Sequence, residues 1–378
     1  MNKQKKRVVF MNGGKHFWNR EKEIIKRLTN EFDFFLVINH SKNVNYKILD
    51  IRNFCLENNV QLKIIDYTSR RARSLKKITE SFKDVREILR FRPDVVYIES
   101  FGNPYFALFA ALLFDKKRSV IGILDYNLHP YKNKTLLKNK FSEIIYKFIS
   151  IKFFSNYQLF SQVQAKKMKA DFPKKHIFCI RIYLIQNDFI VERKVKRNTK
   201  ANFLFFGKIH YYKGLDILLE SAQMLRKKRN DFLVTVAGDS KDFSEYIKYT
   251  KNTDYLDLRV RFLDKEEIAN VFNAADYLVL PYREVTQSGP LLIAFNFKVV
   301  PIVSNLDGFS EYISDGKNGY MFTSESASDL AEKMEYILDS DSFNYDLIQK
   351  NLEEYIKDEF DLNRYVTMYQ TMFNSICS

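Results

Sequence analysis

Cysteine is scarce in this sequence of 378 residues: three occur, far apart, odd in number and without a Cys-x-x-Cys pair (Cys55, Cys179 and Cys377). This usage argues against a disulfide framework or a structural zinc site and favours a reducing compartment. Clusters of His, Asp and Glu with the spacing of metal ligands do not stand out either, and neither does a nucleophile–base pair. We therefore expect a protein that holds no metal ion and no cofactor.

Long apolar runs are missing as well. The basic N-terminal segment contains the apolar run Val8–Met11, which is too short for a signal peptide, and the longest apolar run, Tyr105–Phe114, is about half a membrane span. Repeats of short period are not visible, and aromatic residues are plentiful. We expect a globular cytoplasmic protein without a transmembrane helix, with two domains of roughly 150–200 residues each.

Acidic residues are under-represented in the first half. Residues 1–190 contain 37 Lys and Arg against 17 Asp and Glu, a net charge of +20, whereas residues 191–378 contain 24 against 29, a net charge of −5. Such asymmetry indicates that the first half faces something anionic: a nucleic acid, a membrane surface or a phosphorylated substrate. Alternatively, the excess of basic residues serves only to keep the protein soluble.

Short apolar runs alternate with longer helical patterns in both halves. The predicted strands of the first half are Arg7–Met11, Phe34–Asn39, Gln61–Asp66, Asp94–Ile98, Ser119–Leu124 and Tyr157–Ser161, with helices such as Asn19–Thr29 and Ser81–Arg90 between them. Those of the second half are Asn202–Phe206, Phe232–Ala237, Val260–Leu263, Tyr277–Pro281 and Val299–Ser304. This alternation predicts an α/β protein with two doubly wound parallel sheets. The charged segment 191–201 breaks both patterns and marks the boundary, and residues from about 343 to 378 are typical of terminal helices.

Unusual residues follow four of the predicted strands. They are the segments NGG (12–14), ESFGNP (99–104), DYNLHP (125–130) and YREVTQSGP (282–290). Open parallel sheets bind ligands beyond the carboxyl ends of their strands. Two sheets that each offer such an edge predict a cleft between two domains.

Two lysines surround the predicted start of a helix in the second half. Leu215, Leu218, Leu219, Ala222 and Leu225 have helical spacing, so the helix is expected to begin near Lys213. A lysine at the positive end of a helix is unfavourable unless an anion also lies there. Gly207-Lys208 ends the preceding strand, and Gly214 allows close backbone approach. The pattern suits a bound phosphate or diphosphate, and two solvated surface lysines are the alternative.

Four segments in series resemble the nucleotide-sugar domain of the family 4 retaining glycosyltransferases of the bacterial group 1 type, which have the GT-B fold of two Rossmann-like domains facing across a cleft. They are FFGKIHYYKGLDILLESA (205–222), FLVTVAGDS (232–240), VRFLDKEEIANVFNAADYLVLPYRE (260–284) and VVPIVSNLDGFSEYISDGKNGYMF (299–322), with Ser310 where proline is usual. The resemblance covers roughly residues 201–340 and is much weaker over 1–190.

The resemblance implies a donor site in the second half. Lys208 and Lys213 would contact the donor diphosphate, Glu284 would contact the donor sugar, and all three would act in catalysis. The full donor-binding set comprises Gly207, Lys208, Lys213, Glu284, Thr286, Gln287, Ser288, Gly289 and Pro290. Ile293 stands where a second glutamate, the usual ribose ligand, is expected, so Thr286, Gln287 or Ser288 is the expected ribose partner. An ion pair with Arg283 is the alternative role for Glu284.

The first half resembles the family less closely. In GILDYNLHP (122–130), Asp125 and His129 match a family element of the catalytic site, and Leu124 replaces its first histidine. An ordinary turn is the alternative. Gly13 and Gly14 resemble the glycine-rich first loop, and Glu99 is a candidate acceptor-side carboxylate, with a capping or turn role as its alternative. With Asp125 and His129 these residues form the expected acceptor site.

The implied reaction is metal-independent transfer of a hexose, with retention, from a nucleotide-diphosphate sugar, such as a UDP- or GDP-sugar, to an acceptor hydroxyl. The acceptor would be a glycan or a lipid-linked intermediate of a bacterial cell-surface polysaccharide. The expected domains are an acceptor-binding domain (1–190), a linker (191–200), a donor-binding domain (201–355) and a C-terminal helix (356–378) that packs back toward the first domain. The alternatives are another GT-B enzyme, such as a sugar-nucleotide epimerase or phosphorylase, and a catalytically inactive binding module. No nucleic-acid-binding pattern is recognisable, so no nucleic-acid partner is expected.

The basic first half also predicts peripheral association with an anionic membrane. Segment 141–160 mixes Lys147 and Lys152 with seven aromatic residues, a composition that suits a membrane interface. A core helix that leads into a buried strand is the favoured interpretation for most of these aromatics.

Overall fold

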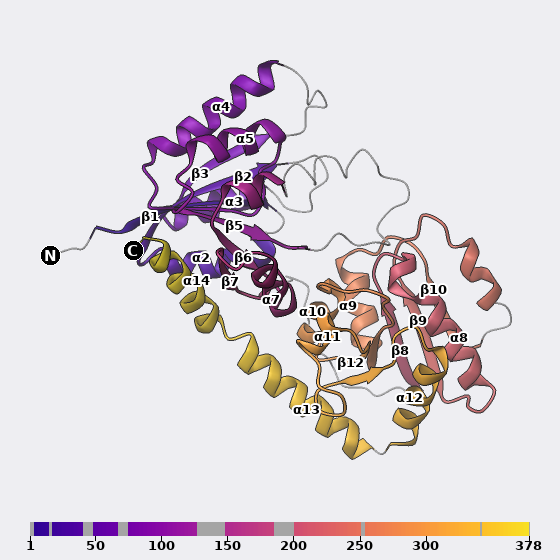
Figure 1. Cartoon of the computed structure of the whole chain (residues 1–378). Coiled ribbons are helices and arrows are strands. Elements are labelled where there is room, and N and C mark those ends of the chain that lie inside the picture. Colours follow the sequence, from indigo (N-terminus) through magenta and orange to yellow (C-terminus); the bar gives the residue numbers. More distant parts are fainter. Residues whose placement is uncertain are drawn as a thin grey trace. The chain divides into compact units, whose positions relative to one another are not determined.

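The computed structural model describes residues 4–14, 17–40, 48–66, 75–126, 148–184, 200–250, 254–340 and 342–377. Contacts divide them into two compact units. Unit 1 contains the described residues up to Tyr183 together with the C-terminal helix from Leu362, and unit 2 contains those from Leu184 to Asp361. Each unit has one parallel sheet with helices packed around it (Figure 1).

The sheet of unit 1 has the strand order β3-β2-β1-β4-β5-β6-β7, and all neighbouring strands are parallel. Its strands are β1 (Lys6–Gly13), β2 (Phe32–His40), β3 (Gln61–Asp66), β4 (Val95–Ile98), β5 (Ser119–Ile123), β6 (Asn156–Leu159) and β7 (His176–Cys179). The order reverses between β1 and β4, which makes their carboxyl ends a topological switch point.

The helices of unit 1 lie between its strands along the chain, and one follows them at the C-terminal end. They are the π-helix η1 (Phe17–Glu21), α2 (Lys22–Leu28), α3 (Ile48–Glu57), α4 (Leu75–Arg90), α5 (Pro104–Leu113), α7 (Gln162–Asp171) and α14 (Leu362–Cys377); residues 148–153 are helical too. At α5, the Asn103 side chain accepts a hydrogen bond of 2.8 Å from the Phe106 amide, and Pro104 occupies the first turn. Both features favour a helix start.

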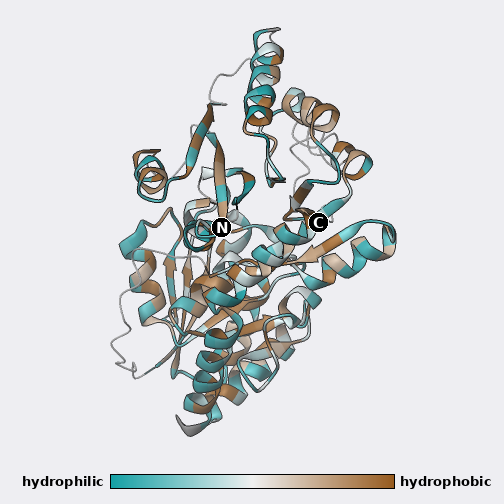
Figure 2. Ribbon diagram, turned by 90° about the vertical axis from the view of Figure 1, so that its left-hand side faces the viewer, coloured by the Kyte–Doolittle hydropathy of each residue, from teal (hydrophilic) through white to brown (hydrophobic). Residues whose placement is uncertain are grey.

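The core of unit 1 is built on its central strands. All four residues of β4 are buried, as are all four of β6. Such complete burial is expected of parallel strands that are covered on both faces. The strands are accordingly brown in Figure 2, whereas many of the surrounding helices carry teal.

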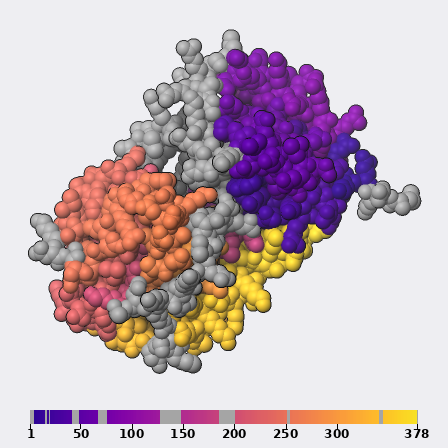
Figure 3. Space-filling model, turned by 180° about the vertical axis from the view of Figure 1, so that it is seen from behind, coloured from indigo at the N-terminus to yellow at the C-terminus, as the bar shows by residue number. Residues whose placement is uncertain are grey.

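The C-terminal helix α14 completes unit 1. Phe373 packs edge-on against Phe32 and Phe34 of β2, with ring centres 5.7 and 6.3 Å apart. Tyr369 accepts a hydrogen bond of 3.3 Å from Gln158 of β6. Figure 3 shows this yellow segment against the indigo N-terminal residues, although the two are more than 300 residues apart in the chain. Residues from both ends of the sequence therefore pack together in unit 1.

The sheet of unit 2 has the strand order β10-β9-β8-β11-β12-β13, again with all neighbours parallel. Its strands are β8 (Ala201–Phe206), β9 (Phe232–Ala237), β10 (Leu256–Arg259), β11 (Tyr277–Leu280), β12 (Val300–Ser304) and β13 (Tyr320–Phe322). Its helices are η2 (Tyr211–Lys213), α8 (Leu215–Arg226), η3 (Ser244–Tyr249), α9 (Lys265–Ala274), α10 (Gly289–Asn296), α11 (Asp307–Ser310), α12 (Ala327–Asp339) and α13 (Ser342–Glu359). Here the order reverses between β8 and β11.

Some predicted elements were wrong in place or missing. The strand predicted at Val260–Leu263 lies at Leu256–Arg259, because it pairs with Val234–Ala237 of β9. The edge strands β7 and β13 were missed. α8 begins at Leu215, because Gly214 takes a left-handed conformation. Among the described residues, no helix is long and apolar enough to cross a membrane.

Candidate functional site

Unit 2 gathers its unusual residues at the switch point of its sheet. Gly207 follows β8, the loop 281–288 follows β11, and η2 leads into α8. These segments all leave the carboxyl ends of β8 and β11, where open parallel sheets bind ligands.

Three elements meet at Gly207. Its φ is 111°, and a Cβ at this position would lie 2.9 Å from Lys213 Nζ and 3.4 Å from Pro290 Cγ. The ammonium of Lys213 and the first turn of α10 therefore both lie against the backbone at residue 207. Only glycine meets both the conformation and the contact.

Lys213 is buried, with an exposed fraction of 7%. Its Nζ lies 5.5 Å from the centre of the Tyr282 ring. Burying an ammonium costs free energy unless polar or anionic groups compensate, so this lysine is not the solvated surface residue of the alternative interpretation. Lys208 is exposed and makes no hydrogen bond or ion pair with the described residues.

Gly214 brings the start of α8 against the end of β11. Its φ is 66°, and a Cβ there would lie only 1.8 Å from the carbonyl oxygen of Pro281. The backbone of Arg283 continues this contact, because its amide donates a hydrogen bond of 2.8 Å to the Tyr212 carbonyl. The turn that carries Lys213 and the loop after β11 thus form one packed body.

The side chain of Arg283 also joins the turn that carries Lys213 to the loop after β11. Its guanidinium donates to both carboxylate oxygens of Asp216, at 3.0 and 2.6 Å, and to the Tyr211 carbonyl at 2.8 Å. It also faces Glu325 at 3.3 Å and stacks 4.1 Å from the centre of the Tyr211 ring. The carboxylates that it contacts are Asp216 and Glu325 rather than Glu284. The alternative pairing of Arg283 with Glu284 was therefore wrong.

The loop ends at the start of α10. Ser288 Oγ accepts a hydrogen bond of 3.3 Å from the Leu291 amide and caps the helix. A Cβ on Gly289 would meet no atom within 4 Å, so the backbone there borders open space. The exposed Gly289 amide, at the positive end of this helix dipole, suits an anion.

The loop 281–288 rests on α11. A Cβ on Gly308 would lie 2.7 Å from the Val285 carbonyl oxygen, which explains the glycine of the segment Gly308–Glu311. Glu284, Thr286 and Gln287 are half-buried in the loop, and Ile293 is half-buried in α10. Of the predicted donor set, the structure thus brings Gly207, Lys213 and Pro290 into direct proximity and places the others on the adjoining loop or beside it.

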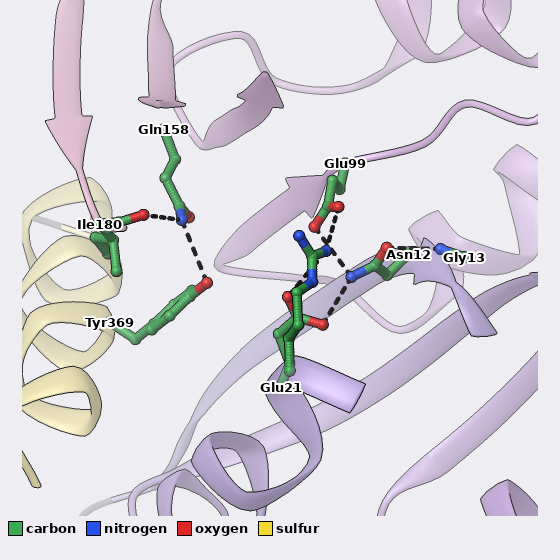
Figure 4. Close-up of polar contacts among 8 residues, drawn as sticks. Asn12, Gly13, Glu21, Glu99, Gln158, Ile180 and Tyr369 are labelled. Carbon is green, nitrogen blue, oxygen red and sulfur yellow. Dashed lines mark hydrogen bonds and ion pairs between the residues drawn. The ribbon is translucent and has the colours of Figure 1, made fainter. Parts of the chain in front are cut away.

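The switch point of unit 1 holds a buried ion cluster (Figure 4). Arg20 of η1 pairs with Glu99, which follows β4, and lies 3.1 Å from Glu21. Asn12 of β1 donates hydrogen bonds of 3.0 Å to both Glu21 and Glu99. The side chains of Arg20, Glu21 and Glu99 are 6%, 3% and 2% exposed. This cluster fills the crevice between β1 and β4 with the chain's own groups.

The charges of this cluster do not balance, since one guanidinium faces two carboxyl groups. Burial raises the pKa of Glu21 well above its usual range; the charge of Arg20 opposes this shift and that of Glu99 adds to it. Burial likewise raises the pKa of Tyr369, whose ring belongs to α14. Protonation of Glu21 would leave one ion pair in the cluster, Arg20 with Glu99.

Glu99 therefore lies in a buried network, and neither the capping nor the turn role applies to it. The Gly13 amide donates 2.6 Å to Asn12 Oδ1 at the edge of this network, and Gly14 is buried beside it. Asp125 is exposed after β5, Leu124 is half-buried, and His129 lies outside the described residues.

Arg20 and Glu21 were not predicted as site residues, although the sequence held a signal. Phe17, Glu21, Ile24, Ile25 and Leu28 follow the spacing of one helix face, and all five are buried. A charged residue on an otherwise apolar face is unusual and marks a paired or functional group. Arg283 and its partner Asp216 carried no such local signal, because they are 67 residues apart.

Comparisons with known proteins bear on both units. Residues 186–357 match the family model described as glycosyl transferases group 1, which confirms the predicted resemblance over this stretch. A D-inositol 3-phosphate glycosyltransferase of Paenarthrobacter aurescens is 29% identical over 150 residues, which are 38% of this chain and 36% of that protein. A glycogen synthase of Thermodesulfovibrio yellowstonii is 26% identical over 175 residues, 44% and 34% of the two chains. The matches thus span about a third of each curated relative.

Solved structures resemble the whole chain. A glycosyltransferase from Rickettsia africae has a TM-score of 0.67 at 14% identity and covers 99% of both chains. Anabaena HepE in complex with UDP and glucose has a TM-score of 0.68 at 14% identity and covers 98% of this chain and 100% of its own. A sucrose-phosphate synthase from Thermosynechococcus elongatus has a TM-score of 0.69 at 10% identity and covers 98% and 99% of the two chains. The predicted α/β GT-B fold is therefore confirmed.

Proposed function

We propose that this protein is a glycosyltransferase and that unit 2 binds a nucleotide-diphosphate sugar at the switch point between β8 and β11. The buried Lys213, whose Nζ lies against Gly207 beside the first turn of α10, carries the proposal. The match of residues 186–357 to group 1 glycosyl transferases supports it.

The main chemical demand of such a transfer is the negative charge that develops on the leaving diphosphate. Lys213, held in position by burial, would stabilise this charge electrostatically in a site of low dielectric. The exposed Lys208 and the N-terminus of α10 at Gly289 would add positive potential from two further directions. These groups supply the stabilisation without a metal ion, and the proposal includes metal-independent transfer.

The loop after β11 would hold the sugar and the ribose. Glu284 would accept hydrogen bonds from sugar hydroxyls, and Thr286, Gln287 or Ser288 would contact the ribose where Ile293 replaces the expected glutamate. A UDP- or GDP-sugar is the proposed donor, and the UDP complex of the similar HepE supports the first of these. Retention of configuration, with the diphosphate oxygen as base, follows from the family resemblance.

The acceptor is proposed to be the hydroxyl of a glycan or lipid-linked intermediate of a cell-surface polysaccharide. Gly13, Gly14, Asp125 and His129 are the proposed acceptor-side residues of unit 1. Glu99 would act there as an acceptor-side carboxylate. Its ion pair with Arg20 links the end of β4 to η1, and the hydrogen bond from Asn12 links it to the end of β1. We propose a cytoplasmic protein that associates peripherally with the membrane.

A catalytically inactive donor-binding module is the second candidate function. It is favoured by Ile293 and Leu124, which stand where the family resemblance implies a glutamate and a histidine. Such a module would bind the donor and release no product.

Nucleotide release separates these candidates. Purified protein is incubated with UDP-, GDP- and ADP-sugars, with and without a lipid-linked glycan acceptor, and free nucleoside diphosphate is measured. A glycosyltransferase releases nucleotide much faster with acceptor, whereas a sugar-nucleotide epimerase needs none. Donor binding without release under any condition would reduce the proposal to a binding module, and absence of donor binding would contradict it.

A further inference from the structure

Helix α5 carries apolar side chains on all of its faces. Its inner residues Phe106, Ala107, Ala110 and Ala111 are buried in the core of unit 1. Its outer residues include Leu108, Leu112 and Leu113, which are 44%, 61% and 40% exposed. A helix that is apolar all round is normally buried or crosses a membrane, and the 10 residues of α5 are too few to cross one.

A neighbouring helix extends this outer face. Phe82 of α4 is 39% exposed and packs edge-on against Phe109 of α5, with ring centres 5.3 Å apart. We define the α5 ridge as Phe82, Leu108, Phe109, Leu112 and Leu113. Figure 2 draws α5 in brown near the top of the view, beside the mostly teal α4. Monomeric proteins rarely leave such a continuous apolar surface in water unless it binds something.

Basic side chains border the ridge. The guanidinium of Arg86 lies 5.8 Å from the Phe82 ring centre, on α4. At the other end, the residues after α5 include the exposed Lys116, Lys117 and Arg118, with one acidic neighbour, Asp115. Long basic side chains beside apolar ones are typical of surfaces that face lipid headgroups, whereas lysine is depleted in the cores of protein–protein interfaces.

A second basic and aromatic group adjoins this end. Lys116 Nζ lies 5.5 Å from the ring centre of Phe153, in the helical residues 148–153. The same helix exposes 58% of Phe148, with Lys152 Nζ 5.2 Å from its ring centre. The deeper aromatic residues of the predicted membrane segment 141–160, Phe154, Tyr157 and Phe160, are buried, and 141–147 lie outside the described residues. The apolar and basic surface is therefore centred on α5 and not on segment 141–160.

We propose that the α5 ridge docks unit 1 on an anionic lipid bilayer. The leucines and Phe82 would enter the boundary between headgroups and acyl chains, and the lysines and arginines at both ends would contact lipid phosphates. The net charge of +20 over residues 1–190 attracts unit 1 to such a surface before contact. This inference rests on the proposed function, because docking through the α5 ridge would bring unit 1 to a membrane that contains the lipid-linked acceptor.

Sedimentation with vesicles tests the proposal on the full-length protein. The vesicles contain either phosphatidylcholine alone or phosphatidylcholine with 30% phosphatidylglycerol, about 30% being a typical anionic content for such assays. We expect binding to the anionic vesicles that is weakened by added salt and little binding to the neutral ones. The double variant Leu108→Gln/Leu112→Gln should bind the anionic vesicles at least about tenfold more weakly, because two exposed apolar side chains are lost.

The matched control is Leu49→Gln/Leu56→Gln on α3, where the two leucines are 61% and 79% exposed. This variant loses the same chemical groups from a different helix and should bind like the unchanged protein. Lys116→Gln/Lys117→Gln should weaken binding and reduce its dependence on salt. Thermal unfolding of every variant checks that the fold is kept.

Four outcomes would overturn the proposal: equal binding to neutral and anionic vesicles, no binding to either, an α5 variant that binds like the α3 control, or a dimer that Leu108→Gln/Leu112→Gln dissociates. The last outcome would assign the ridge to a second copy of the chain. Titration with UDP- and GDP-sugars runs in parallel. Donor binding without vesicle binding refutes the ridge alone, and vesicle binding without donor binding refutes the proposed function alone.

Discussion

At the scale of single residues, the most unusual group in the protein is Glu21. It is 2% exposed and shares Arg20 with Glu99, so the cluster has one carboxyl group more than it has cations. Its raised pKa means that the folded protein binds a proton at Glu21 more tightly than the unfolded chain does. The resulting contribution to stability is fully present below the usual carboxyl pKa and is lost as the pH rises toward the folded pKa.

Replacing Glu21 by glutamine should remove this loss, because glutamine resembles the protonated carboxyl group. We expect the difference in melting temperature between Glu21→Gln and the unchanged protein to grow in favour of the variant from pH 5 to pH 8. Over these about three pH units the unchanged protein loses the stability that the proton on Glu21 provides. The groups that face Glu21 are Arg20, Glu99, Asn12 and Tyr369, and each is kept in this variant.

The comparison variant is Glu99→Gln, which takes away the carboxylate that contacts the buried Arg20. Removing one member of a buried ion pair costs about 3–5 kcal/mol, so unit 1 should unfold at a clearly lower temperature at neutral pH. Thermal unfolding across the pH range measures both effects. If the melting temperatures of the two variants changed with pH in the same way, the assignment of the raised pKa to Glu21 would be wrong.

At the scale of elements, the sequence predicted the central strands and the edge strand β3 well, whereas the other edge strands, β7, β10 and β13, were misplaced or missed. β8, β9 and β11 are apolar runs that end in glycine or proline, and their positions follow from burial on both faces. The placement of β10 depends on its pairing with β9, which no local pattern contains. The predicted loop 282–290 was located correctly after β11. The hydrogen bonds between Arg283 and Asp216 that hold this loop were not predicted, because they also join residues far apart in the sequence.

Arg283 holds the loop after β11 against the start of α8 through Asp216. Arg283→Met removes both hydrogen bonds to Asp216 and the one to the Tyr211 carbonyl. We expect donor affinity to fall about tenfold or more and stability to fall by about 1–3 kcal/mol, because the half-buried Asp216 carboxylate and the Tyr211 carbonyl lose a charged hydrogen-bond donor. Isothermal titration with the donor and chemical denaturation measure the two effects.

Arg226→Met is the matched control, since Arg226 pairs with Asp254 at the far end of α8, at 2.8 Å and largely in solvent. It should cost at most about 1 kcal/mol and leave donor affinity unchanged. In a double-mutant cycle, Asp216→Asn should add little once Arg283 is replaced. Full additivity of the two changes would refute the coupling.

At the scale of the whole molecule, the chain's last helix completes its first unit. Phe373 packs on two phenylalanines of β2, and Tyr365, Tyr369 and Met372 are buried beside it. Terminal helices were expected from the sequence, but the residues of β2 that α14 would cover were not, because residues this far apart share no local pattern. The two ends of the chain therefore stabilise the same core.

Phe373→Ala should destabilise unit 1 by about 3–5 kcal/mol, the usual cost of truncating a buried aromatic side chain. Thr371→Ala, at an exposed position of the same helix, should have little effect. Calorimetry on the full-length protein should show the transition of unit 1 at a lower temperature and that of unit 2 unchanged. A uniform shift of both transitions would contradict the division into two separately stable units.

The central claim is that unit 2 binds a nucleotide-diphosphate sugar through Lys213, and isothermal titration with UDP- and GDP-sugars tests it most directly. The unchanged protein should bind one of these donors. Lys213→Met should bind it at least about a hundredfold more weakly, since a buried charge contact to phosphate is lost. Lys317→Met, at an exposed position of unit 2, should bind it unchanged. Equal donor affinity of Lys213→Met and Lys317→Met would contradict the account.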